Sequence, residues 1–259
     1  MFTFRDEKMH QRNIIIAGTW KIMCVLSAVF LFGVTGGHGQ TIHTQKKDVQ
    51  YIYNGNLTPG YVGAIRTLQA PHGTPVDETY FQPVKLMGAG GIQIAPAAEG
   101  RFLPFMKAPQ IFGLNIGKVY RFRVTGIHLK PGVEVFPTVE LIDRTHPPLG
   151  EEAKYPILIE LTHEDLKLAS EGKFVTRVIY VEDPDFALPI TETEESGQGY
   201  YEISSSSDPL AVADILGRPV AILRIGGRGP DMITEPGMEF LYHCPPFLHY
   251  TFPEQEKNQ

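Results

Sequence analysis

The residues with the clearest potential for chemistry lie near the C-terminus, in the stretch FLYHCPPFLH that begins at residue 240. His243 and Cys244 are adjacent, and His249 follows the cysteine after a pair of prolines. Cysteine thiolate and histidine imidazole are soft ligands, and copper sites use this donor set. The stretch is therefore a candidate copper site, with His243, Cys244 and His249 as its metal ligands.

This stretch is similar to the last copper-ligand loop of the cupredoxins and related copper oxidases, in which a strand ends in His-Cys and a further histidine follows. The resemblance implies a copper protein. The chain departs from it in three ways, because residues 250–253 replace the expected axial methionine, Pro245 replaces a bridging histidine, and no upstream histidine motif is convincing. The competing interpretation is a proline-rich terminal strand that packs its aromatic residues on the domain and binds no cofactor.

The rest of the sequence carries no recognised catalytic motif: it has no G-x-S-x-G, H-E-x-x-H, phosphate-binding loop or C-x-x-C pattern. Adjacent carboxylates occur at 151–152, 164–165 and 194–195. We interpret them as solvated surface, because a glycosidase needs two carboxyl groups opposed across a cleft. Three histidines on predicted turns or caps are interpreted as surface residues: His128, His146 and His163.

Aromatic residues in the first part of the chain suggest a different binding chemistry, since exposed rings can stack on sugars. The available rings are Tyr51, Tyr53, Tyr61, Tyr80 and Phe81. On strands such residues more often belong to the core. A coplanar row of exposed rings would favour a carbohydrate-binding module, and burial of the rings would exclude it.

One stretch in the middle of the chain predicts the framework that positions these candidates. Residues 157–161 alternate between apolar and more polar types, as in a strand with one wet face. Thr162 and Asp165 form a capping-box pattern, so a helix should begin there and end at Gly172. Residues 174–181 are β-branched and aromatic. This strand, short helix and strand predict the corner of a two-sheet β-sandwich.

Three further stretches of the chain carry similar signals. Residues 119–124 alternate between apolar residues and arginines. Asp208 and the proline after it predict a capped helix over 210–216 that stops at Gly217. Residues 220–225 are almost continuously apolar, as in a buried central strand.

The first third of the chain is less clear. Residues 49–53 and 61–68 are interpreted as strands, and the segments 80–86 and 92–95 as a hairpin whose turn is the glycine-rich stretch 88–91. Together the patterns predict an all-β protein, an immunoglobulin-like β-sandwich with an N-terminal β extension and two short helices. The predicted parts are a signal peptide (1–39), an N-terminal β region (40–110), a β-sandwich domain (111–228) and an extended C-terminal arm (229–259).

The signal peptide is predicted from a basic start, an apolar run over 22–35 and small residues before the cleavage point, which we place between Gly39 and Gln40. The alternative is an uncleaved anchor over 14–32, which would bury Lys21 in lipid. Removal of the leader takes away four basic and two acidic residues and leaves 19 Lys and Arg against 27 Asp and Glu, a formal charge of −8. Nucleic acid and anionic lipid are disfavoured as partners by this charge.

Five blocks in one order resemble a family of uncharacterised exported proteins of planctomycete-type bacteria. The blocks are YFQPV (80–84), GKVYRFRV (117–124), PTVE (137–140), FVTRVIY (174–180) and GRPVAILR (217–224). The resemblance covers roughly residues 79–228. It implies a secreted or cell-envelope protein and brings no activity or catalytic residue with it.

These observations favour an exported, non-enzymatic β-sandwich protein with a structural or protein-interaction role at the cell envelope. We expect it to be secreted, periplasmic or on the cell surface, without a cofactor and without a membrane segment once the leader is cut. The expected partner is a protein or an envelope polysaccharide. The alternatives are a carbohydrate-binding module and a cupredoxin-like copper protein that uses His243, Cys244 and His249.

Overall fold

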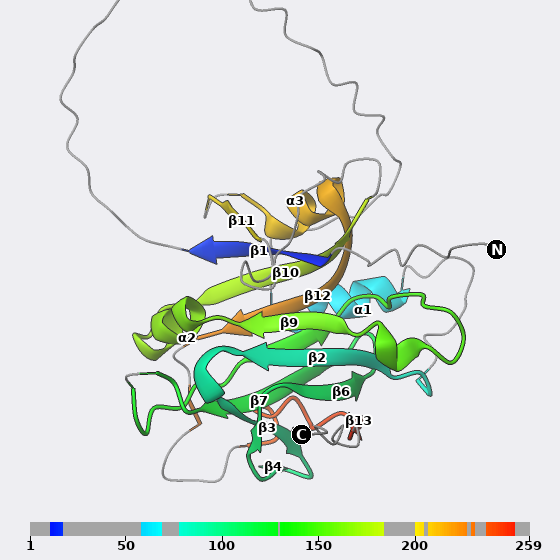
Figure 1. Cartoon of the computed structure of the whole chain (residues 1–259). Coiled ribbons are helices and arrows are strands. Elements are labelled where there is room, and N and C mark those ends of the chain that lie inside the picture. The colour runs from blue at the N-terminus through cyan, green and yellow to red at the C-terminus, as the bar shows by residue number, and fades with distance from the viewer. Residues whose placement is uncertain are drawn as a thin grey trace, which may run out of the picture.

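The structure, a computed structural model, describes residues 11–17, 58–68, 78–128, 130–183, 200–204, 207–226, 229–230 and 237–251. Its strands form a nine-stranded and a four-stranded sheet, which stack as an open sandwich (Figure 1). The mainly-β class predicted from the sequence is therefore confirmed.

The larger sheet contains, in spatial order, β11 (Tyr200–Ile203), β1 (Gln11–Ala17), β10 (Val175–Glu182), β12 (Gly217–Ile225), β8 (Thr138–Leu141), β7 (Val119–Thr125), β3 (Gln93–Ala98) and β4 (Arg101–Phe102), with β5 (Met106–Lys107) also paired to β3. The smaller sheet has the order β13 (Phe247–Tyr250), β6 (Gln110–Leu114), β2 (Gln82–Gly88) and β9 (Ile157–Leu161).

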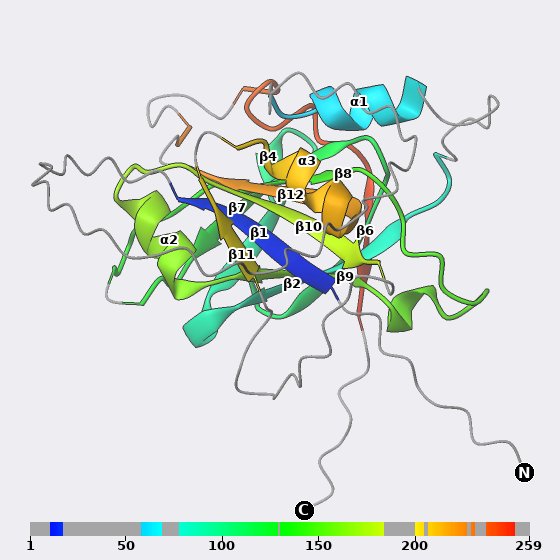
Figure 2. The ribbon, with the colours of Figure 1, turned by 90° about the horizontal axis from the view of Figure 1, so that it is seen from above.

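The described part of the chain has three α-helices, α1 (Tyr61–Leu68), α2 (His163–Ser170) and α3 (Pro209–Leu216), and two 3-10 turns, η2 (Ala89–Gly91) and η3 (Glu152–Lys154). The prediction of two helices, with a strand over 61–68, was therefore wrong. Val62 and Gly63 are buried there, while Tyr61 and Ala64 are exposed. Two adjacent buried residues between exposed ones fit a helix, whereas a strand would alternate. Figure 2 shows α1 on the far side of the sheets from β2 and β9.

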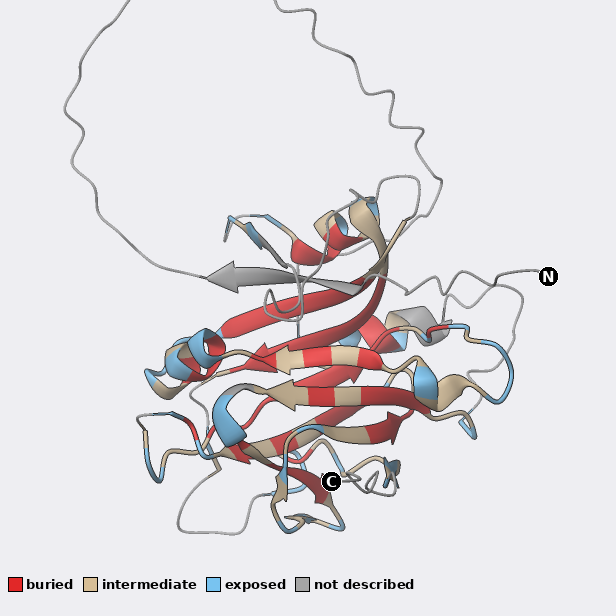
Figure 3. Ribbon diagram, viewed as in Figure 1, coloured by how far each residue is buried: buried red, intermediate tan, exposed pale blue. Residues whose placement is uncertain are grey.

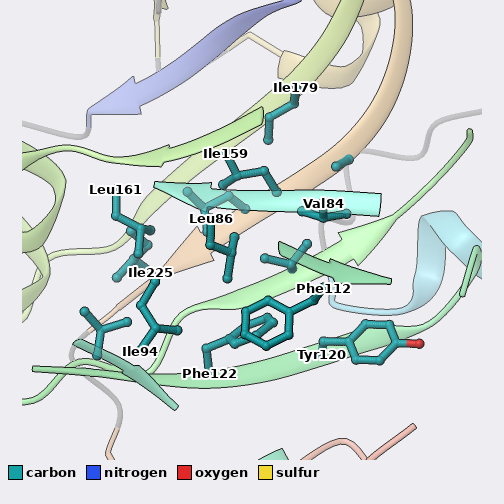
Figure 4. Close-up of a cluster of buried hydrophobic side chains, with 14 of the residues drawn as sticks. Val84, Leu86, Ile94, Phe112, Tyr120, Phe122, Ile159, Leu161, Ile179 and Ile225 are labelled. Atoms are coloured by element: carbon teal, nitrogen blue, oxygen red, sulfur yellow. The ribbon is translucent and has the colours of Figure 1, made fainter. Parts of the chain in front are cut away.

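Two apolar clusters fill the spaces on either side of the larger sheet. The first lies between the sheets and includes Val84, Phe112, Phe122, Ile159 and Ile225 (Figure 4). The second lies between the larger sheet and helices α1 and α3 and contains Val62, Ile142, Val178, Tyr180, Leu210, Ala213 and Ile222. Both faces of β10 and β12 are thus covered (Figure 3), which explains the continuous apolar run predicted as a buried strand.

The predicted corner of the sandwich is present. Thr162 Oγ1 accepts a hydrogen bond from Asp165 N (3.2 Å), and Asp165 Oδ2 accepts one from Thr162 N (3.3 Å). Gly172, beyond the end of α2, has a positive φ of 79°. β9 belongs to the smaller sheet and β10 to the larger one, so the short helix carries the chain between the layers.

A buried ion pair fixes the start of α2 to the larger sheet. Arg177 Nη2 on β10 lies 2.7 Å from Asp165 Oδ2, and the two side chains are 3% and 1% exposed. The same nitrogen donates to Thr162 Oγ1 (3.1 Å). Asp165 therefore neutralises a buried arginine and caps the helix at the same time.

A second buried ion pair holds α1 on the opposite face. Glu140 Oε1 on β8 accepts from Gly63 N (2.8 Å), the third backbone amide of α1. Glu140 Oε2 lies 2.8 Å from Arg224 Nη1 on β12, with side chains 0% and 2% exposed. The three guanidinium nitrogens of Arg224 make no hydrogen bond with good geometry, so the pair is held by charge alone.

The glycine-rich stretch at 88–91 does not form the predicted hairpin. β2 before it pairs in the smaller sheet with β6 and β9, while β3 after it pairs in the larger sheet with β4, β5 and β7. The chain crosses between layers at η2. Strands from both sides of residue 110 share each sheet, so the pairing shows no boundary between the predicted N-terminal region and the sandwich domain. The predicted C-terminal arm likewise contributes β13 to the smaller sheet.

β1 lies within the predicted signal peptide. It pairs antiparallel with β10, from Gln11 opposite Val181 to Ala17 opposite Val175, and parallel with β11. The predicted cleavage residues Gly39 and Gln40 lie outside the described residues. Cleavage there would remove β1 and leave β10 as an edge strand.

Gly217 joins α3 to β12 at a point where two backbones almost touch. A methyl group placed there would lie 2.1 Å from Val181 O. We expect Gly217→Ala to lower the free energy of unfolding by about 1–3 kcal/mol, because the backbone of β10 must move. Gly237→Ala is the matched control, since nothing lies within 4 Å of that position. Equal effects in urea unfolding would contradict the close approach.

Candidate functional site

The structure places the predicted copper ligands on two different elements. His243 and Cys244 lie in a turn after residue 237, and together with Tyr242 they have positive φ values of 58°, 48° and 52°. Three consecutive left-handed residues are unusual for side chains with a Cβ. Hydrogen bonds from His243 N to Met238 O (2.8 Å) and from Cys244 N to Leu241 O (3.1 Å) hold this turn.

His249 lies beyond the turn on β13, and its imidazole is already engaged. Its Nε2 is 2.8 Å from Gln110 Oε1, and its ring stacks on Phe112 with centroids 5.3 Å apart. Within the described ranges, no group of three or more His, Cys, Asp or Glu side chains is arranged to hold a metal. The residues at 243, 244 and 249 therefore do not converge into one ligand set.

The segment that carries the turn packs against β7. Arg121 Nε donates to Phe240 O (3.0 Å), and its guanidinium carbon lies 4.4 Å from the centroid of the Phe240 ring and 5.0 Å from that of Tyr242. Tyr120 OH donates to Pro246 O (2.9 Å). This is the packing that the competing interpretation of the stretch predicts.

Copper binding can be tested directly. We expect no intense thiolate charge-transfer band when Cu(II) is added to the protein, because His249 is engaged with Gln110 and no group of three or more His, Cys, Asp or Glu side chains among the described residues could hold a metal. The measurement is an absorbance titration of the wild type and of Cys244→Ser. A stoichiometric blue or green complex that the substitution abolishes would contradict the expectation.

Tyr120, which bonds the C-terminal segment at Pro246, should make the stability of the fold depend on pH. Burial raises the pKa of Tyr120 to about 12, although a hydrogen bond from Asn115 N opposes the shift. An unfolded tyrosine loses its proton near pH 10. Between pH 10 and pH 12 the unfolded chain therefore loses a proton that the folded chain keeps, and stability falls as pH rises, by up to about 2.7 kcal/mol. Urea unfolding at a series of pH values should show this fall in the wild type and a smaller one in Tyr120→Phe.

The three histidines interpreted as surface residues, His128, His146 and His163, are exposed. The rings of His128 and His163 meet edge to face, with centroids 5.6 Å apart. Partial burial, together with the charges of Arg218 and Arg144, lowers the pKa of His146. None of the three adjoins the C-terminal turn closely enough to form a metal group with it.

The predicted aromatic rings do not form a coplanar exposed row in the described part of the chain. Tyr51 and Tyr53 lie outside the described residues. Tyr61 is 38% exposed, on α1. Tyr80 and Phe81 are half-buried at the start of β2, on the other side of the larger sheet.

A buried polar network lies beneath Tyr80. Gln82 and Thr145 are 0% and 1% exposed. Gln82 Oε1 accepts from Thr145 N (2.8 Å) and from Tyr80 OH (3.2 Å), and its Nε2 donates to Thr145 Oγ1 (3.1 Å). Thr145 Oγ1 donates to Tyr155 O (3.1 Å). The network ties together the start of β2, the loop after β8 and the residues after η3.

The loop after β8 and the turn η3 each carry a charged side chain, Arg144 and Glu152. Arg144 precedes Thr145, and its guanidinium carbon lies 5.5 Å from the centroid of the Tyr80 ring. Glu152 belongs to η3, which contacts β2. Burial raises the pKa of Tyr80; the charge of Arg144 opposes this shift, and Glu152 and Tyr250 reinforce it.

Tyr250 arrives from the far end of the sequence. A methyl group placed at Gly113 would lie 3.0 Å from Phe81 Cβ and 3.1 Å from Tyr250 Cε2, so these two side chains meet over the glycine. Partial burial, and then the charge of Glu152, raise the pKa of Tyr250. We call Tyr80, Arg144, Glu152 and Tyr250 the Tyr80 cluster. The cluster combines two aromatic rings with one cation and one carboxylate.

No protein family, curated protein or solved structure compared with the chain matches it. None of the helices that the structure describes is long and apolar enough to cross a membrane. The resemblance to exported planctomycete-type proteins remains a prediction.

Proposed function

We propose that the chain is an exported, non-enzymatic β-sandwich protein with a structural or protein-interaction role at the cell envelope. The observation that supports this most strongly is the use of its buried charges. The described buried residues include four charged ones, Glu140, Asp165, Arg177 and Arg224. All four belong to the two ion pairs that hold α1 and α2 to the larger sheet.

Acid–base catalysis needs a titratable group that reaches substrate in a partly sequestered place. The four buried charges are directed at helix starts and at each other, so they serve the fold. The Tyr80 cluster, in contrast, has rings and polar groups at the surface, which suits recognition. This contrast favours binding over catalysis.

The proposal is tested by recovering the tagged protein from the organism that makes it. We expect the chain in the envelope or secreted fraction, in a complex larger than the monomer. Intact mass should show the loss of residues 1–39, so that β1 is not part of the exported form. A full-length chain in the cytoplasm would contradict export. A full-length chain in the membrane would show an anchored protein that keeps β1.

Carbohydrate binding is the second candidate function. It is favoured by one observation, the packing of the exposed Arg144 on the half-buried ring of Tyr80 in the Tyr80 cluster.

A further inference from the structure

β1 lies between β11 and β10 in the larger sheet (Figure 1), and we call its place the β1 slot. We propose that, once cleavage removes residues 1–39, the β1 slot takes up an extended, apolar segment of a partner protein as a replacement strand. This proposal rests on the proposed export and protein-interaction role, and it names the interaction surface and the kind of partner.

Removal of β1 would leave backbone hydrogen-bonding groups unpaired along both sides of the slot. β10 pairs with β1 over seven consecutive residues, from Val175 to Val181. β11 pairs with β1 over four residues and, among the strands that the structure describes, with no other. A strand that entered the slot would find hydrogen-bonding partners on both of its edges. Such main-chain bonds provide much of the affinity when a peptide adds to a sheet.

β10 lacks the features that protect the edge of a sheet. Exposed edge strands are usually blunted by charged residues, prolines or bulges, which keep other chains from pairing with them. Over the residues paired with β1, β10 has no proline and one charged residue, Arg177, which is buried in the ion pair with Asp165. Its one register shift belongs to the pairing with β12, whereas the pairing with β1 is unbroken. β10 is therefore built as an interior strand, and it is open to pairing when β1 is lost.

The side chains around the slot favour an apolar occupant. On one face of β10, Val178 and Tyr180 belong to the second apolar cluster, and α3 packs over β10 and β1. On the other face, Ile179 belongs to the first cluster. A strand covered on both faces is a nearly continuous apolar run, and the sequence of β1 ends in three isoleucines and an alanine. The partner segment should therefore carry consecutive β-branched residues and no proline.

The geometry of the slot favours an extended segment over the edge of a second copy. The occupant bonds to β10 on one edge and to β11 on the other, antiparallel to β10 and parallel to β11. An edge strand of a second copy has only one free edge, because its other edge is bonded within its own sheet. An extended segment has two free edges, and the strands on either side fix its direction.

The test is strand exchange in the full chain, with a recognition sequence for a site-specific protease inserted after Gly36. Cutting leaves the β1 fragment bound without a covalent link. We expect a fluorescent peptide with the sequence of residues 9–18 to replace this fragment, with one peptide per chain, and not to enter the uncut chain. Fluorescence anisotropy measures the exchange, in urea just below the unfolding midpoint so that the fragment is released quickly.

Two altered peptides separate strand pairing from non-specific apolar contact. Ile15→Pro in the peptide should weaken binding about a hundredfold, because proline cannot donate to the neighbouring strand and its ring clashes there. Ile15→Val is the matched control and should weaken binding less than about tenfold, because the residue stays β-branched. Both changes are made in the peptide, so the fold of the protein is not altered.

The same peptides test the partner. Added in excess to the complex recovered from the envelope, the unaltered peptide should release the mature chain from its partner, and the Ile15→Pro peptide should not. A cut chain that does not exchange its fragment, or a complex that the peptide leaves intact, would overturn the proposal. Dimers of the mature chain that exclude the peptide would also overturn it, in favour of a second copy. Failure of export is read separately from the fractionation experiment, since strand exchange in the cut chain does not require export.

Discussion

Glu140→Ala is expected to lower the free energy of unfolding by about 3–5 kcal/mol, because it leaves Arg224 buried without a counter-charge. The substitution also removes the acceptor for Gly63 N, so α1 loses the group that fixes its first turn. Urea unfolding measures the change in the free energy of unfolding. Hydrogen exchange should show that the substitution accelerates amide exchange more in α1 than in α2.

Replacing both partners separates the charge from the packing. The double variant Glu140→Leu with Arg224→Met should recover most of the lost stability, because the guanidinium makes no well-formed hydrogen bond that would repay its desolvation. The cost that remains reflects the lost hydrogen bond from Gly63 N to Glu140 and should be about 1 kcal/mol. If Glu140→Ala cost under about 1 kcal/mol, the pair would not be buried as described.

Val178→Ala and Ile222→Ala are each expected to cost about 2–4 kcal/mol through lost burial and the cavity left behind. The two residues stand opposite each other on β10 and β12, and both are 0% exposed. The two side chains belong to one apolar cluster under α1 and α3, so their effects on the free energy of unfolding should not be additive in the double variant.

Ile215→Ala is the matched control for these truncations. Its side chain is 69% exposed on α3, so the same class of change should alter stability by no more than about 0.5 kcal/mol. A cost below about 0.5 kcal/mol at both Val178 and Ile222 would show that the central strands are misplaced.

The sequence predicts a helix start correctly where the capping residue itself supplies the hydrogen-bond acceptor. Thr162 with Asp165 predicts the capping box of α2, and Asp208 with the following proline predicts the start of α3. Each signal contains its own hydrogen-bond acceptor, so no distant contact is needed. In α1, Gly63 N donates to Glu140, which is remote in sequence. That dependence explains why residues 61–68 were interpreted as a strand.

Glycines were harder to interpret, because several physical causes favour the same residue. Gly172 ends α2 with a positive φ, as the sequence predicts. Gly217 also ends a helix, but with an extended φ of 170°, and the approach of β10 is the reason that no side chain fits there. The turn at 88–91 was interpreted as a hairpin because a sequence does not show which sheet each flanking strand joins.

The Tyr80 cluster was only partly visible in the sequence. Tyr80 was selected as a ring that could bind sugar, but Arg144, Glu152 and Tyr250 were not joined to it. They come from a loop, a 3-10 turn and the last strand, and tertiary pairing alone brings them together. The buried Gln82 offered the one local hint, since a glutamine inside a predicted strand needs a partner.

The central claim is that the protein binds a component of the envelope through the Tyr80 cluster. Its most direct test is photo-crosslinking in the producing organism, with p-benzoylphenylalanine placed at Tyr250 in one variant and at Tyr61 in a second. We predict an adduct with an envelope component that depends on light and forms from position 250 but not from position 61. An adduct from position 61 alone, or none from either position, would contradict the claim.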